Sequence, residues 1–83
     1  MNEAEIYGAL TDIFNDVFLR DNMQLKPELT ARDVPGWDSF KQVEIILATE
    51  ERFGTKLLAR EIDHIRCVGD LVQALAAKTN AGL

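Results

Sequence analysis

The chain has 83 residues, of which 47% are hydrophobic and 28% are charged, a balance that predicts one folded domain with a small core and argues against disorder. Its fourteen acidic and nine basic residues give a formal net charge of −5, which disfavours nucleic acid and anionic membranes as partners and favours basic protein surfaces. The single cysteine, Cys67, can form no internal disulfide, and we find no signal-peptide pattern or long apolar run, so a cytoplasmic protein is expected.

The first predicted element is an amphipathic helix over residues 3–20. Ile6, Leu10, Ile13 and Val17 recur at spacings of three and four, and acidic residues lie between them. This pattern predicts a helix with one apolar face directed at a core.

Residues 21–38 lose this periodicity and are predicted to form a long loop. Two prolines forbid a continuous helix, while Leu25, Leu29 and Val34 are spaced as isolated anchors that can hold the loop on a helical bundle. Loops of this length are uncommon unless they are functional. The long connection predicts that the first two helices run near-parallel or cross obliquely.

A second helix is predicted over residues 39–53. A Pro-Gly pair ends the preceding segment, Asp38 and Ser39 are both preferred N-cap residues, and no glycine or proline follows until Gly54. Ser39 is therefore expected at the positive end of a helix dipole, where a phosphate group is stabilised. The alternative is that Ser39 only caps the helix, because Ser39 and Gln42 fit the capping-box pattern.

On a helical wheel, the apolar residues of this second helix form two faces. The face predicted to meet the core carries Ile45, Ile46 and Phe53. The other apolar face carries Phe40, Val43 and Leu47. Three carboxylates are interleaved with this second face: Glu44, Glu50 and Glu51. An apolar strip rimmed by carboxylates is suited to a basic, partly apolar partner, whereas a helix buried on both sides would have to bury three glutamates at a high cost.

Two further helices are predicted after Gly54. A short one over residues 59–65 directs Ile62 and Ile65 inward and depends on packing, since two turns are not stable alone. The last helix, over residues 68–79, is indicated by apolar residues at i, i+3, i+4, i+7 and i+8, starting at Val68.

One stretch of the sequence resembles a known family. Gly36-Trp37-Asp38-Ser39-Phe40, followed by Val43-Glu44-Ile45 and Glu50-Glu51-Arg52-Phe53-Gly54, is similar to the attachment site and second helix of acyl carrier proteins. The resemblance extends over nearly the whole chain. It implies an all-α fold, a small four-helix bundle with three longer helices, a short third helix and a long loop between helices one and two.

The resemblance also implies a cofactor and a function. Ser39, which follows Asp38, would carry 4′-phosphopantetheine, derived from coenzyme A and bound covalently. An acyl or related intermediate of fatty acid, polyketide or related biosynthesis would be carried on this arm as a thioester. Where the family's third helix is often acidic, this chain has Arg60, His64 and Arg66, so partner contacts cannot be transferred to that region.

No catalytic constellation or metal-binding motif is present in the sequence, so the chain is expected to serve other enzymes rather than to be one. The expected partners are a phosphopantetheinyl transferase and acyl-loading and acyl-processing enzymes with basic docking surfaces, with no nucleic acid or membrane partner, and the chain is expected to be a monomer. The expected docking residues are Phe40, Val43, Glu44, Leu47, Glu50 and Glu51. An acyl chain is expected to enter between the second and third helices, in a pocket lined by Ile45, Ile46, Phe53, Ile62 and Ile65.

Two alternatives remain open from the sequence. One is a peptidyl or D-alanyl type of carrier protein, which differs in its cargo and not in its mechanism. The other is a non-carrier acidic helical domain for protein interaction, in which Ser39 is only a helix cap.

Overall fold

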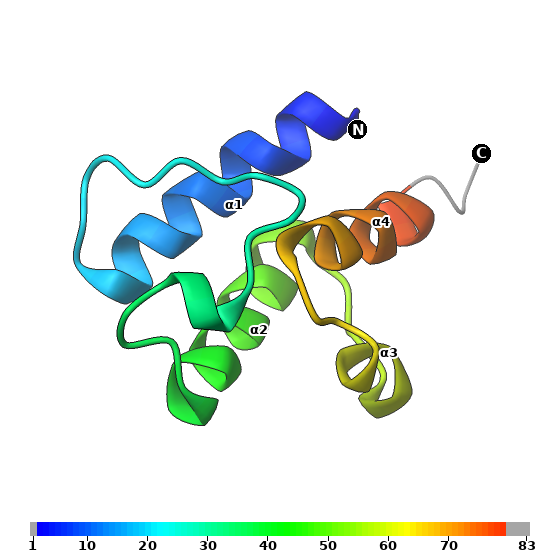
Figure 1. Ribbon diagram of the computed structural model, residues 1–83. Coiled ribbons are helices and arrows are strands. Elements are labelled where there is room, and N and C mark those ends of the chain that lie inside the picture. The colour runs from blue at the N-terminus through cyan, green and yellow to red at the C-terminus, as the bar shows by residue number, and fades with distance from the viewer. Residues whose placement is uncertain (1, 80–83) are drawn as a thin grey trace.

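Four α-helices make up most of the computed structural model, which describes residues 2–79 (Figure 1). The elements in chain order are α1 (Glu3–Phe18), the short 3-10 helix η1 (Ala31–Asp33), α2 (Ser39–Phe53), α3 (Ala59–Asp63) and α4 (Val68–Thr79). The described residues contain no strand, so the predicted all-α, four-helix fold is confirmed. In this part of the chain, no helix combines the length and the apolar character needed to cross a membrane.

Helix α1 is fixed at both ends by local hydrogen bonds. At its start, the Asn2 side chain accepts a hydrogen bond from the Glu5 N–H at 2.8 Å, and the Glu5 carboxylate accepts one from the Asn2 N–H, which forms a capping box. At its end, Leu19 adopts the left-handed conformation with φ 54°, and the Arg20 N–H donates to the Asn15 carbonyl. The helix therefore ends at Phe18, two residues before the end of the predicted range 3–20.

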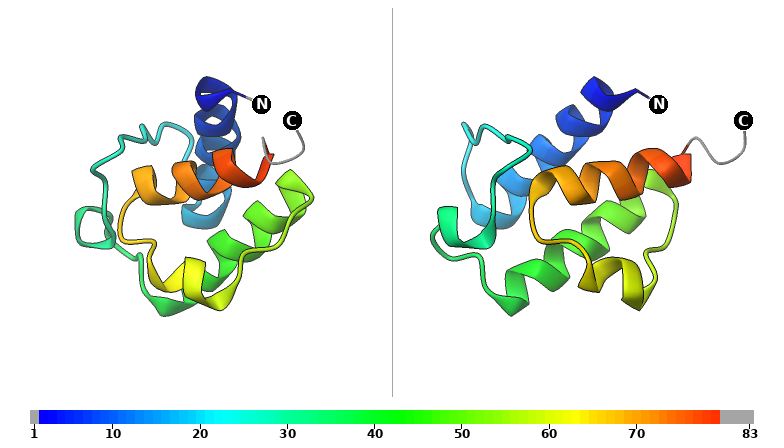
Figure 2. Two further views of the ribbon diagram at one scale, coloured as in Figure 1. Left: turned by 90° about the vertical axis from the view of Figure 1, so that its right-hand side faces the viewer. Right: turned by 45° about the vertical axis from the view of Figure 1, so that its right-hand side comes forward.

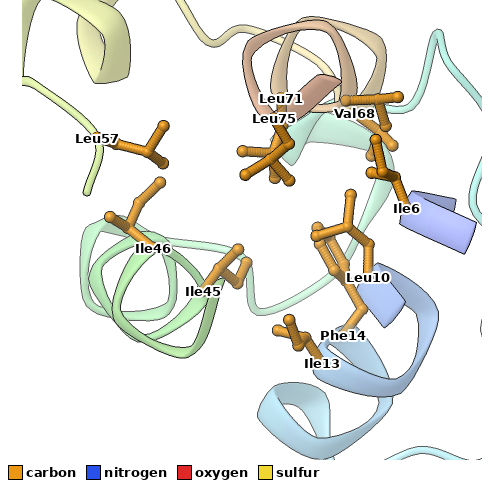
Figure 3. Close-up of a cluster of buried hydrophobic side chains, with 11 residues drawn as sticks. Ile6, Leu10, Ile13, Phe14, Ile45, Ile46, Leu57, Val68, Leu71 and Leu75 are labelled. Atoms are coloured by element: carbon orange, nitrogen blue, oxygen red, sulfur yellow. The ribbon is translucent and has the colours of Figure 1, made fainter. Parts of the chain in front are cut away.

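The hydrophobic core lies where α1, α2 and α4 meet (Figure 3). Its buried side chains are Ile6, Leu10, Ile13 and Phe14 from α1, Ile45 and Ile46 from α2, Leu57 from the α2–α3 link, and Val68, Leu71, Val72 and Leu75 from α4. Helix α3 supplies no fully buried side chain to this core. The three longer helices therefore account for the main core, and α3 lies at its edge.

The long loop between α1 and α2 passes over the start of α4 (Figure 1). The Val68 N–H donates to the Leu29 carbonyl at 2.9 Å, and the Gly69 N–H donates to the Pro27 carbonyl at 2.8 Å. Gly69 also leaves space for this approach, because a Cβ atom there would lie 3.0 Å from the Pro27 carbonyl oxygen. The loop therefore supplies acceptors for the first N–H groups of α4.

Helices α1 and α2 run in roughly opposite directions, with an oblique crossing (Figure 2). Of the two predicted arrangements, the oblique crossing is therefore the one observed, and the near-parallel one is wrong. The loop is long because it reaches α4 before it returns to the start of α2, and not because it travels the length of a parallel pair.

Helix α3 is shorter than predicted, ending at Asp63 instead of residue 65. Its last turn tightens, because the His64 and Ile65 N–H groups bond to carbonyls three residues back, which ends the α-helical pattern. The Glu61 carboxylate holds the helix in place: it accepts from the Leu58 N–H at 2.8 Å and pairs with Lys78 Nζ of α4 at 2.9 Å.

Candidate functional site at the start of helix α2

A turn ahead of α2 positions the beginning of this helix against α1. Gly36 has φ +88°, a value that favours glycine, and the Trp37 N–H closes the turn by donating to the Val34 carbonyl at 3.2 Å. The Trp37 ring then packs edge-on against Phe14, with centroids 5.3 Å apart and planes at 84°. Trp37 thus anchors the chain at the residue before the helix cap.

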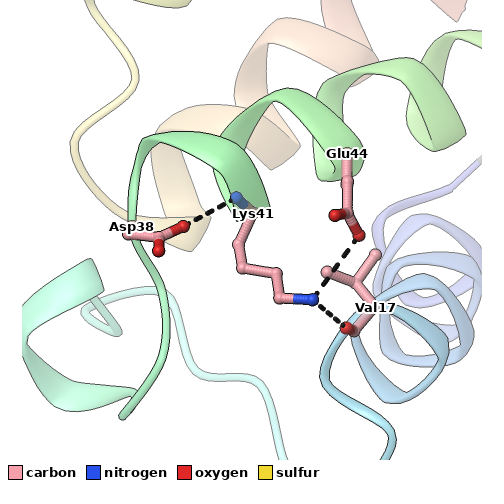
Figure 4. Close-up of polar contacts among 4 residues, drawn as sticks. All are labelled: Val17, Asp38, Lys41 and Glu44. Atoms are coloured by element: carbon pink, nitrogen blue, oxygen red, sulfur yellow. Dashed lines mark hydrogen bonds and ion pairs between the residues drawn. The ribbon is translucent and has the colours of Figure 1, made fainter.

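Asp38 is the N-cap of α2, and its carboxylate accepts a hydrogen bond from the Lys41 N–H at 3.0 Å (Figure 4). The Gln42 side chain accepts from the indole N–H of Trp37 at 2.8 Å. The Ser39–Gln42 capping box, the alternative from the sequence, is therefore wrong, because Asp38 caps the helix and Gln42 is bonded to Trp37.

Ser39 is the first residue of α2 and its side chain is exposed. Within the described residues, no hydrogen bond involves its hydroxyl group. The N–H groups of Ser39 and Phe40 precede the first intrahelical bond of α2, which the Gln42 N–H makes to the Asp38 carbonyl. An exposed hydroxyl and two unpaired N–H groups thus lie together at the positive end of a fifteen-residue helix.

Lys41 is directed toward α1 (Figure 4). Its ammonium group donates to the Val17 carbonyl at 3.1 Å and lies 3.7 Å from the Glu44 carboxylate. Val17 belongs to the last turn of α1, a turn that contains no basic residue of its own. Lys41 therefore places a positive charge at the C-terminus of α1, where a cation is stabilising, and it links α2 to α1.

The second apolar face of α2 is exposed. Phe40 is 81% exposed, Val43 56% and Leu47 60%. A helix buried on both sides is therefore excluded. Single apolar residues on a protein surface are common. Three large apolar residues on the same face of one helix form a patch, and such patches are found at interaction sites.

The three glutamates beside this face differ in their surroundings. Glu44 and Glu51 are exposed, and Glu44 pairs with Lys41. The Glu50 carboxylate accepts a hydrogen bond from the Leu57 N–H at 2.8 Å and so holds the link between α2 and α3. Glu50, predicted as a docking residue, therefore has a structural contact that the sequence did not indicate.

A groove of about 400 Å³ lies between α2 and α3. Ile46 and Ile62, both predicted to line a pocket, meet in it. The groove is completed by Gln42, Val43, Leu47, Glu50, Leu57 and Ala59. Leu57 was not predicted, although an apolar residue shortly after the helix-ending Gly54 could have indicated a buried link.

The other three predicted pocket residues lie elsewhere. Ile45 is buried in the main core, Phe53 packs against that core, and Ile65 lines a different hollow. The structure therefore brings together two of the five residues predicted for an acyl pocket.

That different hollow is a second groove, of about 410 Å³, directly beside Ser39. It is lined by Ala31, Trp37, Asp38, Ser39, Gln42, Ile62, Ile65, Arg66 and Cys67. Sequence reasoning did not connect Arg66 or Cys67 with Ser39. The α3–α4 link brings Arg66 and Cys67 to Ser39, which is more than 25 positions away in the sequence. No local sequence pattern predicts the path of this link.

These features define a class of protein. A small all-α domain with an exposed apolar helix face, acidic neighbours and an exposed hydroxyl at the start of the same helix is suited to docking on other proteins.

Comparison with known proteins gives the family. No protein-family model matches the chain. The acyl carrier protein of Acidothermus cellulolyticus is 32% identical over 79 residues, covering 95% of this chain and 94% of the relative. The meromycolate extension acyl carrier protein of Mycolicibacterium aurum is 31% identical over 71 residues, covering 86% and 73%. The solution structure of a holo acyl carrier protein from Geobacter metallireducens matches with a TM-score of 0.85 at 32% identity, over 92% of this chain and 87% of that one.

This chain belongs to the acyl carrier protein family and has a carrier role. The relatives are carrier proteins, and membership of the family implies interaction with biosynthetic enzymes.

Proposed function

We propose that Ser39 is the attachment site of 4′-phosphopantetheine and that the chain carries an acyl or related intermediate as a thioester on this arm. The observation that carries the proposal is the exposed Ser39 hydroxyl, which is free because Asp38 caps the helix. When bound, the group supplies a thiol that forms thioesters. The chain itself supplies the hydroxyl, a rigid helix and surfaces for docking, and it catalyses no reaction.

The helix start fits a phosphodiester on Ser39. The N–H groups of Ser39 and Phe40 have no intrahelical partner, and the dipole of α2 favours a negative charge there by about 0.3–1 kcal/mol. In the attachment reaction, the Ser39 oxygen forms a bond to the phosphorus next to pantetheine, while the bond from that phosphorus to the bridging pyrophosphate oxygen breaks and adenosine 3′,5′-bisphosphate leaves. The hydroxyl proton leaves to a base on the transferase.

The proposal is tested by incubating the purified chain with a phosphopantetheinyl transferase and coenzyme A, followed by intact-mass spectrometry. We expect one added phosphopantetheine on the wild-type chain and none on Ser39→Ala. Ser39 is the only serine of the chain, and Thr55→Ala serves as a control that leaves the site intact. No addition to a folded wild-type chain with several broad-specificity transferases would refute the proposal.

The same variant separates attachment from capping. Because Asp38 makes the cap hydrogen bond, Ser39→Ala should change the free energy of unfolding by less than about 0.5 kcal/mol, whereas loss of a capping serine typically costs about 1 kcal/mol. A loss of 1 kcal/mol or more would show that the Ser39 side chain takes part in capping the helix.

For docking, we propose that partner enzymes contact the exposed face of Phe40, Val43 and Leu47, while Glu44 and Glu51 steer a basic surface toward Ser39. Exposed charges mainly affect the association rate and its salt dependence, and an apolar anchor mainly affects dissociation.

Charge variants and apolar variants should therefore differ in how the rate of Ser39 modification depends on salt. Glu51→Lys should slow modification most at low salt, and Leu47→Ala should slow it with little salt dependence. Glu28→Lys, an exposed carboxylate on the α1–α2 loop, is a control of equal charge change. If Leu47→Ala lowered the unfolding free energy by several kcal/mol, the face would be core and the docking assignment wrong.

For the cargo, we propose that an acyl chain enters the groove between α2 and α3 at Ile46 and Ile62. The groove is lined mainly by apolar side chains, and α3 is a five-residue helix that does not form without packing. The chemical shifts of Ile46 and Ile62 methyl groups should differ between the holo and long-acyl forms. Identical spectra would place the acyl chain in solvent.

A further inference from the structure

The groove beside Ser39 has walls from three parts of the chain that are distant in sequence. Ser39 and Gln42 belong to α2, Ile62 belongs to α3, and Ile65 lies in the α3–α4 link. Its volume of about 410 Å³ is within the range of roughly 300–1,000 Å³ typical of small-molecule sites. It is separate from the groove between α2 and α3 at Ile46, although Ile62 and Gln42 touch both.

One arginine lines this groove and a second lies in a neighbouring hollow, in a chain of net charge −5. Arg66 lines it, and a neighbouring hollow of about 530 Å³ shares Arg66 and adds Arg32. Within residues 2–79, the ion pairs of the structure involve neither arginine. The nearby Asp70 carboxylate accepts from the backbone N–H of Arg66 at 3.0 Å, which fixes the backbone of this residue. Guanidinium groups bind phosphate oxygens in a bidentate manner, so these two arginines suit a phosphodiester.

The remaining groups of the groove are of two kinds. Trp37, Ile62 and Ile65 are partly buried and provide apolar walls. Gln42 accepts from the Trp37 indole through its oxygen, so its amide N–H groups remain to donate. The one acidic group in the lining, Asp38, is already bonded to the Lys41 N–H.

The kinds of group in the groove match the kinds of group in a phosphopantetheine arm. The arm begins with a phosphodiester, continues with a branched apolar segment and ends with two amides and a thiol. The groove offers a guanidinium, apolar side chains and an amide donor beside the proposed attachment oxygen.

We propose that the arm rests in this groove with its phosphodiester against Arg66. The inference depends on the proposed attachment to Ser39. Arg66 is here a positioning residue, which holds the arm and takes no part in thioester chemistry.

Cys67 provides a native probe of the groove. It is the only cysteine of the chain, it is partly buried, and it lines the same hollow. The experiment compares the rate of Cys67 alkylation by iodoacetamide in the apo chain and in the chain loaded from acetyl-coenzyme A, whose blocked thiol leaves Cys67 as the only free one. An arm that occupies the groove for three quarters of the time slows alkylation about fourfold.

Two arginine variants complete the design. Arg66→Gln should return the loaded-to-apo rate ratio to about one, and using the ratio within each variant removes the direct effect of Arg66 on the neighbouring thiol. Arg60→Gln, an arginine in a different hollow at α3 and α4, should leave the protection unchanged.

The outcomes distinguish the two proposals. If mass spectrometry shows the arm on Ser39 but the wild-type rates are equal, the groove proposal is wrong and the attachment stands. If Arg66→Gln keeps the full protection, the assignment of Arg66 to the phosphodiester is wrong. If no arm is added to Ser39, the proposed function itself fails.

Discussion

Thr49 in the middle of α2 is a buried polar residue whose substitution should stabilise the fold. Its side chain is 0% exposed, and among the described residues its hydroxyl oxygen has no hydrogen-bond partner. A buried hydroxyl without a partner keeps its desolvation cost without the compensating bond. Valine has nearly the same shape and carries a methyl group in place of the hydroxyl, so Thr49→Val removes this cost without opening a cavity.

The magnitude follows from two contributions. An unsatisfied buried polar group costs about 1–3 kcal/mol, and burying one further methyl group contributes about 0.8 kcal/mol. A threonine hydroxyl in a helix can rotate toward the carbonyl four residues back, which reduces the gain. We therefore expect Thr49→Val to raise the free energy of unfolding by about 1–2 kcal/mol. In a domain of this size, each kcal/mol raises Tm by about 4–8 °C.

The assay is urea unfolding followed by the fluorescence of Trp37, the only tryptophan, with circular dichroism as a second probe. Thr49→Ser keeps the hydroxyl and loses the methyl group, so it should destabilise the fold by about 1 kcal/mol and serves as the matched control. A Thr49→Val chain that is no more stable than the wild type would show that the hydroxyl is satisfied in solution, and the reasoning would be refuted.

Three further substitutions test other parts of the fold. Gly8→Ala should stabilise α1 by about 1 kcal/mol in thermal unfolding, because a Cβ there meets no neighbouring atom, whereas Gly69→Ala should destabilise by about 1 kcal/mol or more, because its Cβ would meet Pro27. Equal effects of the two glycine variants would contradict the loop contact. Hydrogen bonds from Leu58 and the Lys78 ammonium lower the pKa of Glu61 below its ordinary value of 4.5. The carboxylate therefore adds stability that is complete above that value and is lost as the pH falls through the lowered pKa, so Glu61→Gln should destabilise at neutral pH and become equal to wild type in acid.

The longer helices could be predicted from the sequence because their signals are local. Helix α2 spans residues 39–53 in both the prediction and the structure, since an N-cap residue and a helix-ending glycine, Gly54, stand at its ends. The end of α1 was predicted two residues too late, because a left-handed Leu19 gives no sign in the sequence: glycine or asparagine usually occupies that position.

The details of the site were only partly predictable, because they depend on contacts between distant residues. Asp38 and Ser39 are equally good caps by residue type. Trp37 decides between them, because its indole N–H bonds to the Gln42 side chain, which a capping box with Ser39 would need. The contact of Glu50 with the Leu57 N–H likewise depends on the path of the α2–α3 link.

Helix α2 therefore carries two separate sets of side chains, and this explains how one helix of fifteen residues can serve both stability and binding. Ile45 and Ile46 are 1% and 6% exposed and join α2 to the core, while Phe40 and Leu47 are 81% and 60% exposed and contribute little to it. Apolar area that stays in contact with water contributes almost nothing to the free energy of folding, so folding does not explain the presence of this face on α2. Its free energy becomes available only when another surface covers it, and a partner that docks there lies beside Ser39, at the start of the same helix.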